Sequence, residues 1–233
     1  MLAQRLGQAI NWKHAFGELI LIAAGILLAL AASDLYEDRV ERQEEIEALQ
    51  EIRIALESDN KTLAAEIAHF EGVVAKLDRL LAHLDAESPY DPSLDEAFGA
   101  AYALRLIRMN TSPYESLKST GLKTVSNRKL RTRLIELYDQ DYSNLEGMNE
   151  IQVNIILEAL RPYFLEHFQD LDFGTSATPI SYDYLKNDQR FRNLIDYRSR
   201  AIFTAQLASY PLTAKRVQAL IEAIDEEIGK GSD

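Results

Sequence analysis

Apolar residues dominate one continuous stretch near the start of the chain, residues 16–35, with the sequence FGELILIAAGILLALAASDL. No charged side chain interrupts this stretch between Leu19 and Ala32. A helix of about 20 residues is about 30 Å long, which is close to the hydrocarbon thickness of a bilayer. The pattern therefore predicts a transmembrane anchor over residues 16–35.

The charges on either side of the apolar stretch predict its orientation. The basic residues before it are Arg5 and Lys13, and the acidic residues just after its centre are Asp34, Glu37 and Asp38. Because positively charged flanks stay on the cytoplasmic side, residues 1–15 are expected to form a cytoplasmic arm and residues 36–233 an extracytoplasmic domain. Trp12 and Tyr36 stand at the two ends and are the expected interfacial anchors, since amphipathic rings favour the headgroup level.

Three other interpretations compete with the anchor. A cleavable signal peptide fits the small residues of Ala29-Leu30-Ala31, but the leader would be long and Glu18 adjoins its core. A buried helix of a soluble protein also accommodates a run of this length. A helix lying in the plane of the interface would need a polar face, which the central turns lack. Length and flanking residues favour the anchor.

Small residues recur along one face of the predicted anchor helix. Gly25, Ala29 and Ser33 are four residues apart, and Ala32 lies beside them. Such a face lets another helix approach closely, which predicts packing on a membrane protein partner or self-association; alanine and glycine are also simply common in membrane helices. Glu18 lies near the cytoplasmic end, where a carboxylate reaches water, so a solvated group is favoured over a functional intramembrane one.

Beyond the anchor, apolar residues repeat at strict seven-residue intervals. They are Leu49, Leu56, Leu63, Phe70, Leu77 and Leu84. No proline or glycine occurs between Leu35 and Gly72, so the pattern predicts one long helix over residues 36–85 with an apolar seam of the coiled-coil type. Asp59 and Asn60 interrupt the neighbouring apolar stripe, which indicates either a hinge or a polar layer that sets the register. Both packing within the chain and packing between chains satisfy the seam.

The rest of the chain also carries helical periodicity. Helices are predicted over residues 94–109, over residues 127–168 and from residue 188 onward, with bends at Pro162 and Pro211. Residues 169–184 are expected to be irregular, and no run shows the alternation of a strand. The expected fold class is therefore all-α: an N-terminal transmembrane helix that continues into the heptad-patterned helix, followed by an elongated antiparallel helical bundle over residues 94–233.

A short capped helix is predicted at residues 112–121. Ser112 and Glu115 have the spacing of a capping box, with proline between them at the first helical position, and Gly121 can end the helix. An architectural role explains this pattern without any ligand. The functional hypothesis is that Tyr114, Glu115 and Lys118 form part of a surface on which a partner protein docks.

Two stretches resemble a family of bacterial single-pass membrane proteins known only by a domain of unknown function. They are Gly17-Glu18-Leu19-Ile20-Leu21-Ile22 continuing to Leu30, and Tyr114-Glu115-Ser116-Leu117-Lys118-Ser119-Thr120-Gly121 followed by Leu130-Arg131 and Leu134-Ile135-Glu136-Leu137-Tyr138. The resemblance implies a retained anchor in the bacterial inner membrane and a helical domain on the periplasmic side. One departure is Tyr36, where the family tends to have tryptophan. The resemblance implies no activity.

The net charge limits the partners of the chain. Two basic and two acidic residues precede Tyr36, so the whole net charge of −12 lies on the predicted extracytoplasmic domain. A domain this acidic is repelled by phosphate backbones, which argues against nucleic acid as a partner. The chain has no cysteine, so disulfides and thiolate chemistry are excluded.

No arrangement of residues predicts a catalytic or metal site, and no cofactor is expected. His69 and His83 are about four helical turns apart, about 20 Å, which is too far for one metal ion. Nucleophile-elbow, phosphate-loop and dinucleotide motifs are missing from the sequence. Asp139 and Asp141 stand between Tyr138 and Tyr142, a cluster best interpreted as a solvated helix face.

The favoured function is a non-enzymatic membrane-anchored scaffold or accessory subunit that presents a helical surface to partner proteins. Its expected partners are the bilayer and a membrane protein, or a second copy of the chain, contacted through the anchor and the heptad helix. The alternative is an extracytoplasmic ligand-binding or sensor module that relays its state through a membrane partner, since helical bundles can hold small molecules between their helices. An enzyme is the third choice, given the missing motifs.

Overall fold

The computed structural model describes residues 12–230, and the side chains of residues 12–15 fall outside that description. Most of the predicted cytoplasmic arm and the side chain of the predicted anchor Trp12 therefore lie outside the described residues. The chain divides into two compact units, Met1–Glu47 and Ala48–Asp233. Helix α1 (Trp12–Asp85) contributes residues to both units.

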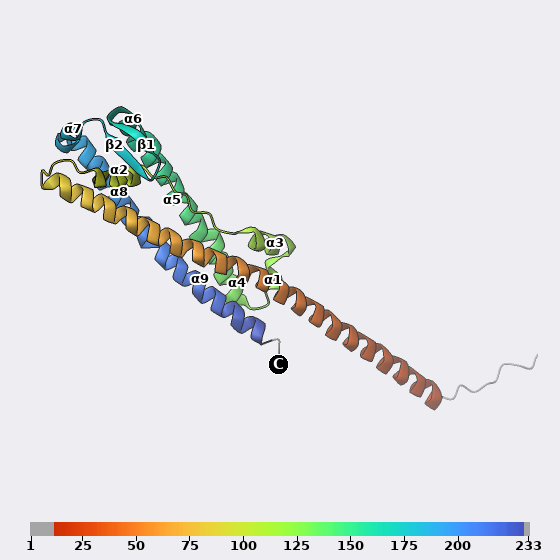
Figure 1. Ribbon diagram of the computed structural model, residues 1–233. Helices are drawn as coiled ribbons and strands as arrows, with labels where there is room; N and C mark the ends of the chain where they lie inside the picture. The colour runs from red at the N-terminus through yellow and green to blue at the C-terminus, as the bar shows by residue number, and fades with distance from the viewer. Residues whose placement is uncertain (1–11, 231–233) are drawn as a thin grey trace, which may run out of the picture. The chain divides into compact units, whose positions relative to one another are not determined.

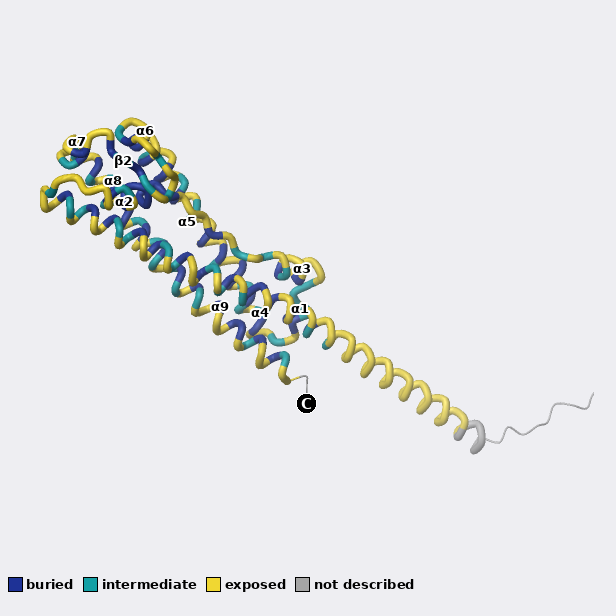
Figure 2. Tube along the Cα trace, viewed as in Figure 1, coloured by how far each residue is buried: buried dark blue, intermediate teal, exposed yellow. Residues whose placement is uncertain are grey.

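The first unit contains the apolar part of α1. The described chain has one helix that is long and apolar enough to cross a membrane, Glu18–Asp85, whose most apolar 18-residue window has a mean hydropathy of 2.2. None of that window is buried. Figure 2 shows this part of α1 as exposed along its length. A core helix of a soluble domain would instead be covered by its neighbours, so the described chain gives no support to that interpretation.

The second unit is a bundle of helices, which confirms the predicted all-α class. Three rods run along it. The first rod is the part of α1 from Ala48 onward. The second rod consists, in chain order, of α4 (Arg128–Ile135), the π-helical turn η3 (Glu136–Tyr142), α5 (Ser143–Asn154), the π-helical turn η4 (Ile155–Leu160) and α6 (Arg161–His167). The third rod consists of α8 (Gln189–Thr204) and α9 (Gln206–Gly229). Pro162 lies in the first turn of α6, directly after η4.

Side-chain bonds show that the third rod runs antiparallel to α1. Along α1, Arg53 pairs with Asp225, Asn60 with Gln218, Phe70 with Tyr210, Asp78 with Ser199, and Asp85 with Arg192. Each step forward on α1 is therefore matched by a nearly equal step backward on α9 and α8, which lie alongside it in Figure 1. The predicted antiparallel arrangement is confirmed.

The heptad seam of α1 lies in the core of the second unit. All six seam residues are at most 1% exposed: Leu49, Leu56, Leu63, Phe70, Leu77 and Leu84. They join one buried cluster with apolar residues of α9 such as Val217, Leu220 and Ile224. The seam therefore packs within the chain. Since α1 continues through Asp59 without a break, the polar interruption is a buried layer and not a hinge.

The helix predicted over residues 94–109 is wrong in its second half. The structure has a short 3₁₀ turn, η1 (Pro92–Leu94), and α2 (Asp95–Ala101), after which residues 103–111 have no regular secondary structure. We call residues 103–111 the connecting segment. It leads to α3 (Ser112–Thr120) and the 3₁₀ turn η2 (Leu122–Thr124).

The predicted capping box at α3 is also wrong in detail. The N-cap residue is Thr111, not Ser112, and its side chain makes no capping hydrogen bond. Instead the Glu115 amide donates to the Thr111 carbonyl (3.0 Å). The C-terminal prediction is confirmed: Gly121 ends the helix with φ of +118°, a conformation that residues with a Cβ avoid.

The stretch predicted to be irregular contains a β-hairpin. Strands β1 (Phe168–Asp172) and β2 (Ser176–Pro179) pair antiparallel, with a bulge between Gln169 and Asp172. The hairpin packs on α2, where a Cβ added to Gly99 would lie only 2.2 Å from the backbone nitrogen of Ser176. Glycine at this position thus allows the strand backbone to approach the helix.

The chain returns through α7 (Tyr182–Asn187) to the third rod. Asp188 caps α8, since its side chain accepts a hydrogen bond from the Arg190 amide (2.9 Å), which confirms the predicted helix start. The interruption of the last helix lies at Ala205, between α8 and α9, whereas Pro211 lies inside α9.

Candidate functional site

The residues predicted to pack in the membrane lie on the exposed part of α1. Gly25, Ala29, Ala32 and Ser33 are all exposed, and a Cβ added to Gly25 would meet nothing within 4 Å. Tyr36 is exposed as well, like the residues on either side of it. These residues make up one face of the helix that no other described residue of their unit covers.

The predicted docking residues separate into buried and exposed ones. Tyr114 is fully buried, so it cannot itself contact a partner, and this part of the docking hypothesis is corrected. Glu115 and Lys118 are exposed neighbours on α3. Lys118 contacts the Glu115 carboxylate (3.7 Å) and the Asp139 carboxylate (3.3 Å), and its Nζ lies 5.4 Å from the centre of the Tyr114 ring.

Tyr114 belongs to a cluster of three buried tyrosines. Its ring stacks on the Tyr138 ring at a centroid distance of 4.4 Å, and Tyr138 meets the Tyr142 ring edge-on at 5.0 Å. The Tyr114 hydroxyl donates to Asp139 (3.2 Å), and the Tyr142 hydroxyl donates to Asp59 on α1 (2.7 Å). This tyrosine cluster ties α3, η3 and α1 together.

The tyrosine cluster differs from the solvated face predicted for this part of the chain. A solvated face was expected for residues 138–142, yet Tyr138 and Tyr142 are at most 4% exposed. Residues four positions apart lie on the same side of a helix, and Tyr138 and Tyr142 keep this arrangement in the π-helical turn η3. The four-residue spacing of the two tyrosines is the one feature of the sequence that indicates a shared buried face. The acidic residues between them favoured a solvated face instead.

Burial sets the protonation of this cluster. It raises the pKa of Tyr114, Tyr138 and Tyr142 well above the ordinary value of a tyrosine, and nearby carboxylates raise it further. Burial likewise raises the pKa of Asp59, although hydrogen bonds from Asn110 and Tyr142 act in the opposite direction. The tyrosine hydroxyls therefore remain protonated in the neutral range, where they serve as hydrogen-bond donors that hold the helices in register.

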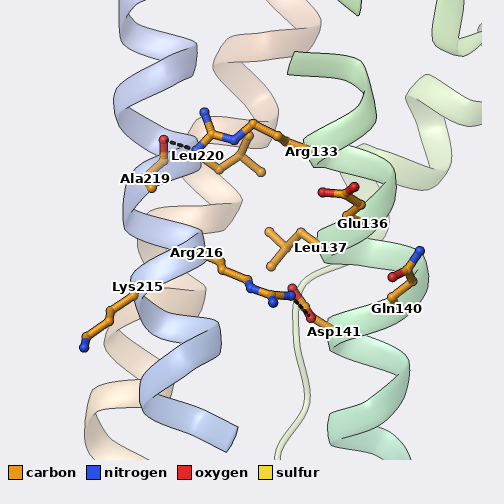
Figure 3. A pocket seen from close by; sticks show the side chains of 9 residues that line it. All are labelled: Arg133, Glu136, Leu137, Gln140, Asp141, Lys215, Arg216, Ala219 and Leu220. Atoms are coloured by element: carbon orange, nitrogen blue, oxygen red, sulfur yellow. Dashed lines mark hydrogen bonds and ion pairs between the residues drawn. The ribbon is translucent and has the colours of Figure 1, made fainter. Parts of the chain in front are cut away.

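A cavity of about 490 Å³ opens beside η3, between the second rod and α9 (Figure 3). Its residues on the second rod are Arg133, Glu136, Leu137, Gln140 and Asp141, and those on α9 are Lys215, Arg216, Ala219 and Leu220. Two contacts cross it: Arg216 pairs with Asp141 at 2.5 Å, and Arg133 donates to the Ala219 carbonyl at 2.7 Å. Both guanidinium groups are thus already bonded to protein atoms. The cavity is a groove between helices that these two contacts span.

Three polar residues, one from each rod, hold the connecting segment; Asp59 and Arg198 are buried, and Asn149 is half-buried. Asp59 accepts a hydrogen bond from the Asn110 amide (2.8 Å), and Arg198 donates to the Ala103 carbonyl (2.9 Å). Asn149 bonds both backbone groups of Ile107, accepting from its amide (3.1 Å) and donating to its carbonyl (2.8 Å). These contacts replace the helical hydrogen bonds that the segment gives up. Sequence reasoning found only Asp59, as an interruption of the apolar pattern.

Residues 12–230 do not bring together three or more His, Asp or Glu side chains that could hold a metal ion. His69 and His83 both lie on α1 and face different surroundings: His83 bonds the Pro89 carbonyl (2.8 Å), whereas His69 stacks edge-on against Phe70.

Comparison with protein-family models, with curated proteins and with solved structures gave no match. The resemblance of the two motif stretches to a membrane protein family therefore stays a prediction. The function has to be argued from the exposed apolar helix and from the surfaces of the bundle.

Proposed function

We propose that this protein is a non-enzymatic membrane-anchored scaffold or accessory subunit, with its helical bundle presented to partner proteins outside the cytoplasm. The observation that carries the proposal is the uncovered apolar part of α1. Between Leu19 and Ala32, eight large apolar side chains are each more than half exposed: Leu19, Ile20, Leu21, Ile22, Ile26, Leu27, Leu28 and Leu30.

The free-energy cost of exposing these side chains to water supports a lipid environment for this part of α1. Removing one large aliphatic side chain from water contributes about 1.5–3 kcal/mol, so eight of them represent about 12–24 kcal/mol. That amount is comparable to the whole folding stability of an ordinary domain. A bilayer covers all of these side chains at once, whichever way they point around the helix.

The charge distribution supports an orientation with the N-terminus in the cytoplasm. Arg5 and Lys13 precede the apolar part of α1, and the residues after it are mainly acidic. The absence of cysteine makes this testable, because one introduced cysteine is the only thiol in the chain. In sealed cells, an impermeant maleimide should label Lys129→Cys on α4 but not Gln4→Cys in the arm. Labelling of Gln4→Cys alone, or release of the chain by alkaline carbonate, would refute the proposal.

The small-residue face of the anchor is the proposed contact with a membrane partner. Single cysteines at Gly25, Ala29 and Ser33 should form disulfides, or crosslinks to a second protein, under mild oxidation. Leu27→Cys and Leu30→Cys are matched controls, since their helical positions place them on other faces. Equal crosslinking at all five positions would show that the helix has no preferred packing face.

The exposed part of α3 is the proposed contact with a partner outside the membrane. A photoactivatable residue at Glu115 should capture a protein at a defined stoichiometry in native membranes, whereas the same residue at Lys129 should not. Identical capture at both positions would count against a docking surface at α3.

The second function that the sequence allows, a ligand-binding module, is supported by a cavity beside His69 in the bundle.

A further inference from the structure

A second cavity lies at the end of the bundle where the connecting segment meets the hairpin. It has a volume of about 510 Å³, which is ample for a small organic molecule. Its walls come from α1, the start of the connecting segment, η4, α6 and the hairpin turn. The residues that matter for its chemistry are His69, Tyr102, Arg105, Leu157, Arg161 and Phe173.

The rim of this cavity is apolar and exposed. Phe173 is 71% exposed, and Leu104 and Leu157 are each 43% exposed. The Phe173 ring lies 5.2 Å from the ring of Tyr102, which is itself buried in the wall. An aromatic pair and two leucines gathered around one opening form a surface that favours an apolar ligand body.

The charged groups at the cavity are predominantly positive. Arg161 makes no hydrogen bond or ion pair with any residue in the described part of the chain. Arg105 pairs with Glu66 at 2.7 Å, and that is the one carboxylate that contacts the cavity's cations within residues 12–230. Behind the wall lies Arg198, which is 1% exposed and bonds neutral oxygens of Gln152 and Ala103, while its Nε has no partner.

The charges around His69 are also mainly positive. Burial lowers the pKa of His69 below its ordinary value, and the charge of Arg105 lowers it further. Glu66 acts in the opposite direction, while Arg198 and Lys76 again lower it. His69 is therefore neutral at pH 7. Its buried Nε2 has no hydrogen-bond partner among the described residues.

We propose that this cavity binds a small organic carboxylate with an apolar body. The unpaired guanidinium of Arg161 meets the carboxylate, the neutral His69 ring forms part of the wall, and Phe173 and Leu157 cover the apolar part of the ligand. An inorganic anion would leave the apolar rim in water, and an organic cation would be repelled by Arg105 and Arg161. The proposal goes beyond the scaffold function, because that function needs no small molecule.

The test uses the full chain in nanodiscs of zwitterionic lipid, with naphthalene-2-carboxylate as the probe and the neutral naphthalene-2-carboxamide as its isostere. Affinities are measured by calorimetry, with empty nanodiscs as the blank. The carboxylate should bind at least about tenfold more tightly than the amide, as expected for one charge-assisted hydrogen bond. Arg161→Gln should abolish this preference. Arg128→Gln is the matched control, since it removes the same charge from an exposed position on α4 that does not line the cavity.

A second variant separates loss of the site from loss of the fold. Phe173→Ser changes an exposed side chain, so the circular dichroism of the chain should stay the same while both probes bind about tenfold more weakly. Equal binding of carboxylate and amide, unchanged binding by Arg161→Gln, or a dissociation constant above about 1 mM for the carboxylate would each overturn the proposal. Membrane topology is measured separately, so these outcomes do not depend on the anchor.

Discussion

Asp59 is a buried carboxylate in an otherwise apolar part of the bundle, and its removal tests how the connecting segment is held. The side chain is 2% exposed and accepts two hydrogen bonds, from the Tyr142 hydroxyl (2.7 Å) and from the Asn110 amide (2.8 Å). Asp59→Ala leaves the Tyr142 hydroxyl buried without a partner, at about 1–3 kcal/mol, and removes a second bond worth about 1 kcal/mol. We expect a total loss of about 2–4 kcal/mol in the free energy of unfolding.

A double-mutant cycle isolates the contact between the two side chains. Tyr142→Phe removes the hydroxyl, so adding Asp59→Ala to it leaves no orphaned donor on the ring. The double variant should therefore lose less stability than the sum of the single variants, by about 1–3 kcal/mol. Additive losses would mean that the bond contributes nothing and would refute the reasoning.

The assay is urea unfolding of the full chain in micelles, followed by circular dichroism in the near ultraviolet. All tyrosines except Tyr36 lie in the second unit, so the tyrosine signal reports mainly the bundle, whereas the single tryptophan, Trp12, belongs to the other unit. The slope of the free energy of unfolding against urea concentration should be the same in all variants if each exposes the same surface on unfolding.

The protonation of Asp59 gives the same prediction a pH dependence. Its pKa in the folded chain is raised above 3.8, chiefly by burial, so the folded state binds the proton more tightly than the unfolded state. The stabilisation from Asp59 is thus fully present below its unfolded pKa and is lost as the pH rises through its folded pKa. The conservative variant Asp59→Asn lacks this loss, so its stability relative to the natural chain should increase with pH across that window. A relative decrease would show that the folded pKa is lowered instead.

Three further substitutions follow from the packing, each measured by the same unfolding assay. Leu63→Ala truncates a fully buried seam residue and should cost about 2–5 kcal/mol; a loss below about 1 kcal/mol would place the seam outside the core. Gly99→Ala puts a Cβ 2.2 Å from the Ser176 backbone, so the hairpin must move and Tm should fall, whereas an unchanged Tm would argue against close contact. Asn149→Leu removes both bonds to the Ile107 backbone and should cost about 2 kcal/mol, with faster hydrogen exchange at the Ile107 amide.

The long helices could be predicted because their apolar residues repeat at helical intervals over many turns. The seam residues from Leu49 to Leu84 are all buried, and the cap at Asp188 follows a local rule that needs no tertiary information. The hairpin of β1 and β2 could not be predicted in this way. Its sequence does not alternate, and the strands are held by contact with α2 at Gly99, which is distant in sequence.

The connecting segment shows a second limit of local patterns. Residues after Ala101 carry apolar side chains at helical spacing, yet the helix ends there because Arg198 and Asn149 bond the backbone of the segment in a non-helical conformation. These two residues lie about 40 or more positions further along the chain. The candidate docking surface was affected similarly, since Tyr114 fits a surface pattern but stacks on Tyr138 in the core.

The connecting segment also links the core to the proposed ligand cavity. Its first residues line that cavity, at Ala103 and Arg105, whereas its last residues are held by Asp59 and Asn149. A ligand that contacts one end of a segment stabilises the conformation that the other end also requires, because the two share one backbone. The coupling is reciprocal, so loosening the segment at Asn149 should weaken a ligand in the cavity by the same factor by which that ligand tightens the segment. On the proposed binding of a ligand, Asp59 and Asn149 are therefore expected to affect a cavity that neither of them lines.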